Sequence, residues 1–291
     1  MENYLQFPNL LTRFRTRNEA VRIAIAECLG TMIFVLIGDS VVAQSILPGP
    51  PYLTYISAPL GWGLALLLAT LVIGGVSGAH LNPAVSLAYA TVGKLRLKEL
   101  PIYMLAQYLG AFLGAVLVYF VYKDAIYAVG KPGVWENSGE VTAMVFACYP
   151  FNEVSSGRCF VDQVVSTALL LLAVAAISDK KNMAVPRPAQ PFAISLCLVG
   201  IIYGFLMNSG APLNPARDLS PRIFTAMAGW GKEVFSYRDY NWFWVPIIGP
   251  HLGAVIGIWI YKIAIEIQWP TETRIEEDLQ MENPFERQES T

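Results

Sequence analysis

The sequence has few charged residues. Asp, Glu, Lys and Arg make up 14% of its 291 residues, and apolar residues make up 55%. A typical soluble domain carries about 25% charged residues, so this composition excludes an ordinary soluble protein and indicates a membrane protein. The sequence has no basic patch that would predict a nucleic-acid partner. Five stretches contain no charged residue at all: 40–93, 100–122, 163–178, 188–216 and 240–261.

The sequence is also poor in the residues that carry chemistry. It has two histidines and four cysteines, and none of them shows the close spacing of a metal site. We therefore expect no metal and no cofactor. Cys28 and Cys197 lie in apolar stretches and are expected to be packing residues. Cys148 and Cys159 flank an outer loop and could form a disulfide, although only their proximity favours one.

The apolar stretches predict six transmembrane helices, since a span needs about 20 mostly apolar residues. A basic cluster precedes the first stretch, which is too long for the apolar region of a signal peptide. Pro48 to Pro51 predicts a tight turn after this first helix. The predicted spans are 20–46, 54–74, 99–122, 160–178, 189–208 and 241–266.

A twelve-residue sequence occurs twice, at 77–88 and at 209–220, with eight identical positions. Each copy places a polar Asn-Pro-Ala within an apolar region: Asn82, Pro83 and Ala84, then Asn214, Pro215 and Ala216. Asn is a good helix N-cap and Pro a good first helical residue. Each motif therefore predicts a short helix, over 82–93 and 214–226. Such segments cannot cross a bilayer, so we expect re-entrant half-helices that line a cavity.

The repeat extends beyond the motif. Glu27 and a Leu-Gly-Ala at 109–111 flank the first copy, and Asp162 and a Leu-Gly-Ala at 252–254 flank the second. Three spans per half is an odd number, so the halves must have opposite topology. The predicted fold is an all-α membrane protein with six transmembrane helices and two re-entrant half-helices in an inverted repeat.

The predicted channel domain covers 20–269, with repeats at about 20–122 and 160–266. A segment at 1–19 precedes it, and an acidic tail at 270–291 is expected to be disordered. Three basic groups fall on one side of six spans: the N-terminal arginines, 94–98 and 180–187. The positive-inside rule makes that side cytoplasmic, with both termini there. We expect a multi-pass protein of the cell membrane.

Two half-helices that enter from opposite faces meet with their N-termini near the midplane. Each N-terminus carries about half a positive charge, so a cation or a proton there meets repulsion. Asn82 and Asn214 place amide donors at the same point, where they can orient a neutral molecule with lone pairs. This arrangement predicts a passive channel for neutral solutes.

At these motifs the chain resembles the aquaporin (major intrinsic protein) family, over about 20–270. Asp218 after Arg217, Tyr149-Pro150 and the insertion at 228–235 resemble its aquaglyceroporin branch. The resemblance implies a homotetramer that conducts water and glycerol, with urea as a further candidate permeant. It also implies an outer selectivity filter formed by Trp62, Ile202, Ala211 and Arg217. Ile202 departs from the very small residue usual in glycerol channels.

Four other polar residues have expected roles. Arg217 lies directly beside Asp218, but adjacent helical residues do not face each other, which favours a pore-lining Arg217. Asp218 is expected to be structural. The resemblance implies that Glu27, and Asp162 in the second half, accept hydrogen bonds from re-entrant loop backbone. His80 is either a neutral residue that satisfies loop carbonyls or, with Glu27, a pH gate, because imidazole titrates near about pH 6.5.

Three other classes of function remain as alternatives. An intramembrane enzyme would need a cluster of nucleophile, base or metal ligands, and the sequence shows none. A junction or adhesion protein could share the fold with a closed pore. A coupled transporter would need a second ionisable site at the midplane. Solute flux through the purified protein in liposomes separates these classes.

Overall fold

The computed structural model describes residues 15–47, 56–130 and 140–270, and within these ranges all regular structure is helical. The predicted fold class is confirmed: six of the described helices are long and apolar enough to cross a membrane. They are α2 (Glu19–Ile46), α3 (Ser57–Ser77), α5 (Leu100–Val129), α7 (Ser156–Ser178), α8 (Gln190–Ser209) and α11 (Val245–Ala264). A short 3₁₀ turn, Arg187–Ala189, precedes α8.

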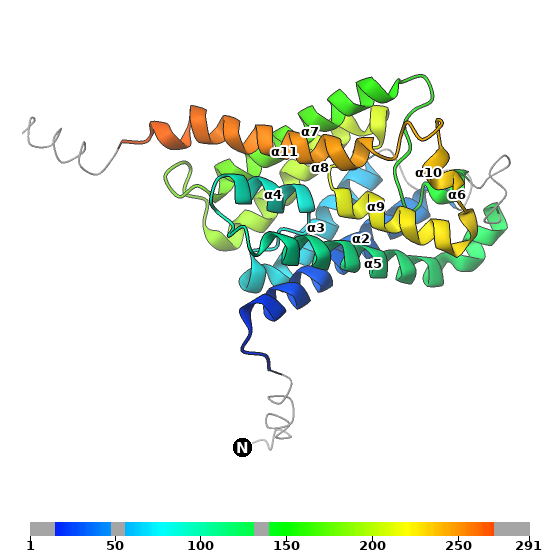
Figure 1. Ribbon diagram of the computed structural model, residues 1–291, viewed down its shortest axis with the longest axis horizontal. Helices are drawn as coiled ribbons and strands as arrows, with labels where there is room; N and C mark the ends of the chain where they lie inside the picture. The colour runs from blue at the N-terminus through cyan, green and yellow to red at the C-terminus, as the bar shows by residue number, and fades with distance from the viewer. Residues whose placement is uncertain (1–14, 48–55, 131–139, 271–291) are drawn as a thin grey trace, which may run out of the picture.

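Two short helices, α4 (Pro83–Thr91) and α9 (Pro215–Thr225), lie among the long ones (Figure 1). The long helices pack in matching ways in the two halves, since α2 contacts α5 and α3, and α7 contacts α11 and α8. Each half-helix packs on a long helix of the other half, α9 on α5 and α4 on α11. The two repeats are therefore interlocked in one body and do not form separate domains.

Glycines allow the long helices to approach closely at matching places in the two halves. A side chain at Gly110 of α5 would lie 2.2 Å from the Cys28 carbonyl oxygen of α2. A side chain at Gly253 of α11 would lie 2.3 Å from the Val164 carbonyl oxygen of α7. The two Leu-Gly-Ala sequences therefore occupy equivalent helix crossings, as the predicted inverted repeat requires.

The observed boundaries differ from the predicted ones by a few residues, with one larger difference. The half-helices begin at Pro83 and Pro215, directly after their asparagines, and α5 continues to Val129 rather than to 122. Lys123 lies within the observed α5, and its ammonium is 6.0 Å from the rings of Tyr119 and Tyr127 on the same helix face. Short helices α6 (Glu140–Ala143) and α10 (Glu233–Ser236) lie in the long connections.

The predicted turn at Pro48 to Pro51, most of the 1–19 segment and nearly all of the 270–291 tail lie outside the described residues. The possible disulfide is not formed, because Cys148 and Cys159 are both free. The Cys148 thiol instead donates to the Gly210 carbonyl in the second re-entrant loop, and the Cys159 thiol donates to the Asn208 carbonyl in the last turn of α8.

Candidate functional site

The two re-entrant loops have the same unusual backbone. Three residues in each copy adopt the left-handed region: Gly78, Ala79 and Leu81 in the first loop, and Gly210, Ala211 and Leu213 in the second. The φ angles of Leu81 and Leu213 are 55° and 54°. Such strain at a non-glycine residue costs about 1–3 kcal/mol, so other contacts must hold it in place. The sequence repeat is therefore a repeat of backbone geometry.

The two asparagines are bonded across the repeat interface. Asn82 Nδ2 donates to the Leu213 carbonyl at 2.9 Å, and Asn214 Nδ2 donates to the Leu81 carbonyl at 2.7 Å. Each Oδ1 caps its own half-helix, accepting from the amide of Ala84 at 2.9 Å or of Ala216 at 3.0 Å. An amide nitrogen carries two hydrogens, so each asparagine retains one donor beyond its cross-link.

Both asparagines line a central cavity of about 750 Å³. Along α8 the lining runs from Gln190 to Ile202, a distance of about 18 Å at 1.5 Å per residue. Apolar side chains supply much of the wall: Phe34, Leu66, Leu170, Val174, Ile194 and Leu198. The cavity thus combines an apolar wall with amide donors at the meeting point of two helix N-termini, where positive charge is unfavourable.

The four predicted filter residues line one end of this cavity. Trp62, Ile202, Ala211 and Arg217 all border it, and all four are buried. The Arg217 guanidinium carbon lies 4.3 Å from the centroid of the Trp62 ring, within cation–π range. The structure therefore brings together residues that are up to 155 positions apart, counting from Trp62 to Arg217.

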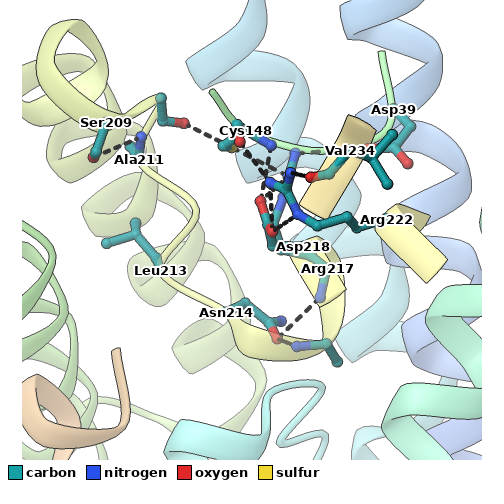
Figure 2. Close-up of polar contacts among 12 residues, drawn as sticks. Asp39, Cys148, Ser209, Ala211, Leu213, Asn214, Arg217, Asp218, Arg222 and Val234 are labelled. Carbon is teal, nitrogen blue, oxygen red and sulfur yellow. Dashed lines mark hydrogen bonds and ion pairs between the residues drawn. The ribbon is translucent and has the colours of Figure 1, made fainter. Parts of the chain in front are cut away.

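A network of buried polar groups surrounds the base of Arg217 on α9 (Figure 2). Asp218 accepts from Arg222 Nε at 2.9 Å and from the backbone amide of Cys148 at 2.8 Å. Arg222 also donates to the carbonyl oxygens of Cys148 at 2.7 Å and Val234 at 2.8 Å. Asp218 thus lies in a structural position, joining α9 to both outer loops.

The expectation about Arg217 and Asp218 needs a correction. Arg217 Nη1 lies 4.0 Å from Asp218 Oδ2, so the adjacent side chains do approach, at the limit of an ion pair. A closer anion is Asp39 on α2, whose Oδ1 lies 3.6 Å from Arg217 Nη2. Nη1 also donates to the Cys148 sulfur at 3.2 Å. Sequence reasoning did not identify Asp39 or Cys148 as neighbours of Arg217.

Glu27 holds the first re-entrant loop, as expected. Its two carboxylate oxygens accept from the backbone amides of His80 at 3.0 Å and Leu81 at 2.8 Å. They also accept from the Ser77 hydroxyl at 2.5 Å and from Gln107 Nε2 at 2.8 Å. Four donors on one buried carboxylate are what holds Leu81 in its left-handed conformation.

In the second half the expected role of Asp162 is divided between two residues. Asp162 accepts from the Ser209 hydroxyl at 2.6 Å, but the loop amide of Leu213 donates to Gln163 Oε1 at 3.0 Å. The prediction that Asp162 binds loop backbone is therefore wrong. Gln163 is the residue equivalent to Glu27. Each is followed by the residue whose carbonyl meets the matched glycine, Cys28 at Gly110 and Val164 at Gly253. Asp162 is also one methylene shorter than Glu27.

His80 follows the C-terminal end of α3, whereas Trp62 lies near its start, so His80 lines the cavity at the end away from the filter residues. Nδ1 is 3.1 Å from the Ser86 hydroxyl, and the ring lies against Tyr89 and Tyr103, with centroids 5.0 Å and 4.6 Å away. Its Nδ1 partner is thus a hydroxyl rather than the expected loop carbonyl. Only its backbone amide bonds the Glu27 carboxylate.

Comparison with known proteins agrees with this geometry. The sequence pattern named "Major intrinsic protein" matches residues 15–261. The chain belongs to the major intrinsic protein family. Aquaporin-9 of Homo sapiens is 41% identical over 277 residues, covering 95% of this chain and 94% of the relative. Aquaporin-10 of Homo sapiens is 37% identical over 270 residues, covering 93% and 89%.

A solved structure gives the same result for the fold. The X-ray structure of the aquaglyceroporin from Plasmodium falciparum superposes with a TM-score of 0.77 at 30% identity, covering 85% of this chain and 98% of that one. The resemblance to the aquaglyceroporin branch is confirmed. Because the major intrinsic proteins are channels, this chain is a membrane channel and not an enzyme.

Proposed function

We propose that this aquaporin is a passive channel for water, glycerol and similar small neutral solutes, and that it excludes ions and protons. The observation that carries the proposal is the crossed asparagine pair within the central cavity. Each Nδ2 is fixed by one hydrogen bond to the opposite loop. The direction of its second hydrogen is therefore already set before a solute arrives. A hydroxyl or water oxygen that passes can accept that hydrogen and then leave.

Exclusion of cations follows from the same arrangement. The half-helices present two N-termini, each with about half a positive charge, to one short section of the lumen. The lumen there is lined by amide donors and apolar side chains, which cannot replace the hydration shell of a cation. A neutral solute is not repelled by the helix N-termini and has no tightly held hydration shell to lose. The site can therefore discriminate by charge without a moving part.

The outer filter is proposed to consist of Trp62, Ile202, Ala211 and Arg217. Trp62 offers a flat apolar wall to the carbon chain of a polyol, and Arg217 offers donors to its hydroxyls. Ile202 adds bulk to the apolar wall where a smaller residue would widen it. We expect this bulk to limit larger polyols, and urea to be a weaker permeant than glycerol.

The inner end is proposed to be a pH-sensitive gate formed by His80 and Glu27. The supporting observation is that His80 lines the cavity while its backbone amide is bonded to Glu27, so a change at this residue acts directly on the loop. Charged His80 would be drawn towards the Glu27 carboxylate. The expected direction is opening on acidification.

Orientation and assembly are also proposed. Lys94 pairs with Glu266 at 2.8 Å, and Arg96 pairs with Glu19 at 3.0 Å, so the first basic loop meets the N-terminus of α2 and the 3₁₀ turn Glu266–Gln268 that follows α11. With the basic residues on the cytoplasmic side, both termini lie there. We propose a homotetramer in the cell membrane, with one pore in each subunit.

The test is stopped-flow light scattering on proteoliposomes, with water, glycerol and urea as separate solutes. We expect water and glycerol flux well above empty liposomes and no flux of potassium ions or protons. A protein that forms intact oligomers but conducts neither solute would instead support a junction or adhesion role with a closed pore.

A further inference from the structure

Asp39 is an unusual residue for the middle of a transmembrane helix. It lies on α2, its side chain is completely buried, and neither carboxylate oxygen has a hydrogen-bond partner within the described part of the chain. A buried carboxylate normally has hydrogen bonds or a cation beside it, because its desolvation is costly. Here the cation is Arg217, with Nη2 3.6 Å from Asp39 Oδ1.

Arg217 in turn has few strong acceptors. Its one side-chain hydrogen bond in the described residues goes to the Cys148 sulfur, which is a weak acceptor. The other nearby carboxylate, Asp218, is 4.0 Å away and is already bonded to Arg222 and to the Cys148 amide. Asp39 is therefore the anion available to balance Arg217, and the two arginines and two aspartates together form a neutral set.

The residue before Asp39 acts on the other wall of the filter. A side chain at Gly38 would lie 2.2 Å from the Trp62 ring, so only glycine lets this ring pack against α2. Two adjacent residues of α2 thus contact both Trp62 and Arg217. The guanidinium carbon of Arg217 lies 4.3 Å from the centroid of the Trp62 ring. Helix α2 is the surface against which the whole stack is set.

We infer that Asp39 is a positioning residue of the filter, which keeps the Arg217 guanidinium stacked on Trp62 at the wall of the lumen. The inference deepens the proposed function and rests on it. Without the carboxylate the guanidinium loses its counter-charge and becomes free to swing into the cavity. Narrowing of this kind hinders glycerol more than water, because glycerol is the wider molecule.

The test compares Asp39→Asn, Arg217→Ala and the double variant in proteoliposomes, measuring glycerol and water permeability. We expect Asp39→Asn alone to lower the glycerol-to-water ratio by about tenfold, within the range of couplings between contacting residues. In the Arg217→Ala background the same change should leave the ratio unaltered. Thr31→Val is the matched control, since Thr31 is also buried on α2, its hydroxyl has no hydrogen-bond partner among the residues that the structure describes, and it is not part of the cavity lining there.

An unaltered ratio in Asp39→Asn, or an equal fall in both backgrounds, would overturn the inference. Thermal stability provides a second measurement that does not depend on transport. Arg217→Ala leaves the Asp39 carboxylate buried without a cation, so adding Asp39→Asn should raise the Tm of Arg217→Ala by about 3 °C, while Asp39→Asn alone lowers the Tm. If the double variant is no more stable than Arg217→Ala, the pairing is wrong even where the protein conducts. A wild-type protein without glycerol flux would refute the proposed function, and the Tm comparison would still test the pair.

Discussion

The crossed asparagines make the sharpest prediction, through Asn82→Asp. The substitution keeps the size of the side chain and its Oδ1 cap on the Ala84 amide. It replaces the Nδ2 donor by an oxygen, which then faces the Leu213 carbonyl oxygen from 2.9 Å. One cross-link between the two halves is lost, and a negative charge enters the lumen between the half-helices.

The expected magnitudes separate stability from selectivity. A buried carbonyl left without its donor costs about 1–3 kcal/mol. Half a positive charge at a helix N-terminus stabilises a carboxylate about 4 Å away by about 2 kcal/mol, at an effective dielectric constant of about 20. The fold should therefore survive. A cation at the same distance gains about 4 kcal/mol, which corresponds to nearly three orders of magnitude in occupancy.

The assay is paired measurement of glycerol flux and cation leak in proteoliposomes loaded with a pH-sensitive or potassium-sensitive dye. We expect Asn82→Asp to reduce glycerol flux and to produce a measurable leak, and the double Asn82→Asp/Asn214→Asp variant to leak more. Asn182→Asp is the control, since it adds the same charge at an exposed site after α7. Unchanged glycerol flux with no leak in the double variant would refute the reasoning.

Three further predictions follow from the same geometry. Ile202→Gly should raise glycerol flux more than water flux, whereas Ile201→Gly, on the same helix but not in the cavity lining, should not change their ratio; equal ratios in both would mean that Ile202 does not narrow the filter. Acidification of the cytoplasmic side should increase glycerol flux in wild type but not in His80→Ala, and Glu27→Gln should weaken the response; a flat wild-type profile ends the idea of a gate. Gln163→Leu should lower the free energy of unfolding by about 1–3 kcal/mol, because the Leu213 amide loses its acceptor; a denaturation midpoint equal to wild type would contradict this role.

The elements of the fold that a local pattern encodes could be predicted from the sequence. The Asn-Pro starts of both half-helices and the six spans depend on residues close together in the chain, and the matched Leu-Gly-Ala sequences revealed the repeat, although their place at helix crossings came only from the structure. The role of Glu27 could be assigned because an acid in an apolar span must have partners, and the resemblance to the aquaporin family implied that these are amides of the re-entrant loop. The end of α5 could not, because a charged residue at the membrane surface does not itself stop a helix.

Contacts between distant segments could not be predicted in the same way. Nothing local tells whether Asp162 or Gln163 faces the second loop, since the two are adjacent and both polar. A signal was present: Glu27 and Thr31 share their spacing with Gln163 and Thr167, and alignment on that spacing selects Gln163. No comparable pattern connects Asp39 or Cys148 with Arg217, since each lies in a different part of the chain.

The two halves of the channel share their backbone but differ in charge, and this difference explains where selectivity lies. The residue after each Asn-Pro-Ala is Val85 in the first half and Arg217 in the second, and both border the central cavity. The loops and their asparagines must match, because the cross-links require two equivalent carbonyls. The following residue is outside that constraint. In the proposed function, repulsion of cations therefore comes equally from both half-helices, whereas donors to solute hydroxyls come from one arginine only, at the end where α2 places a buried carboxylate beside it.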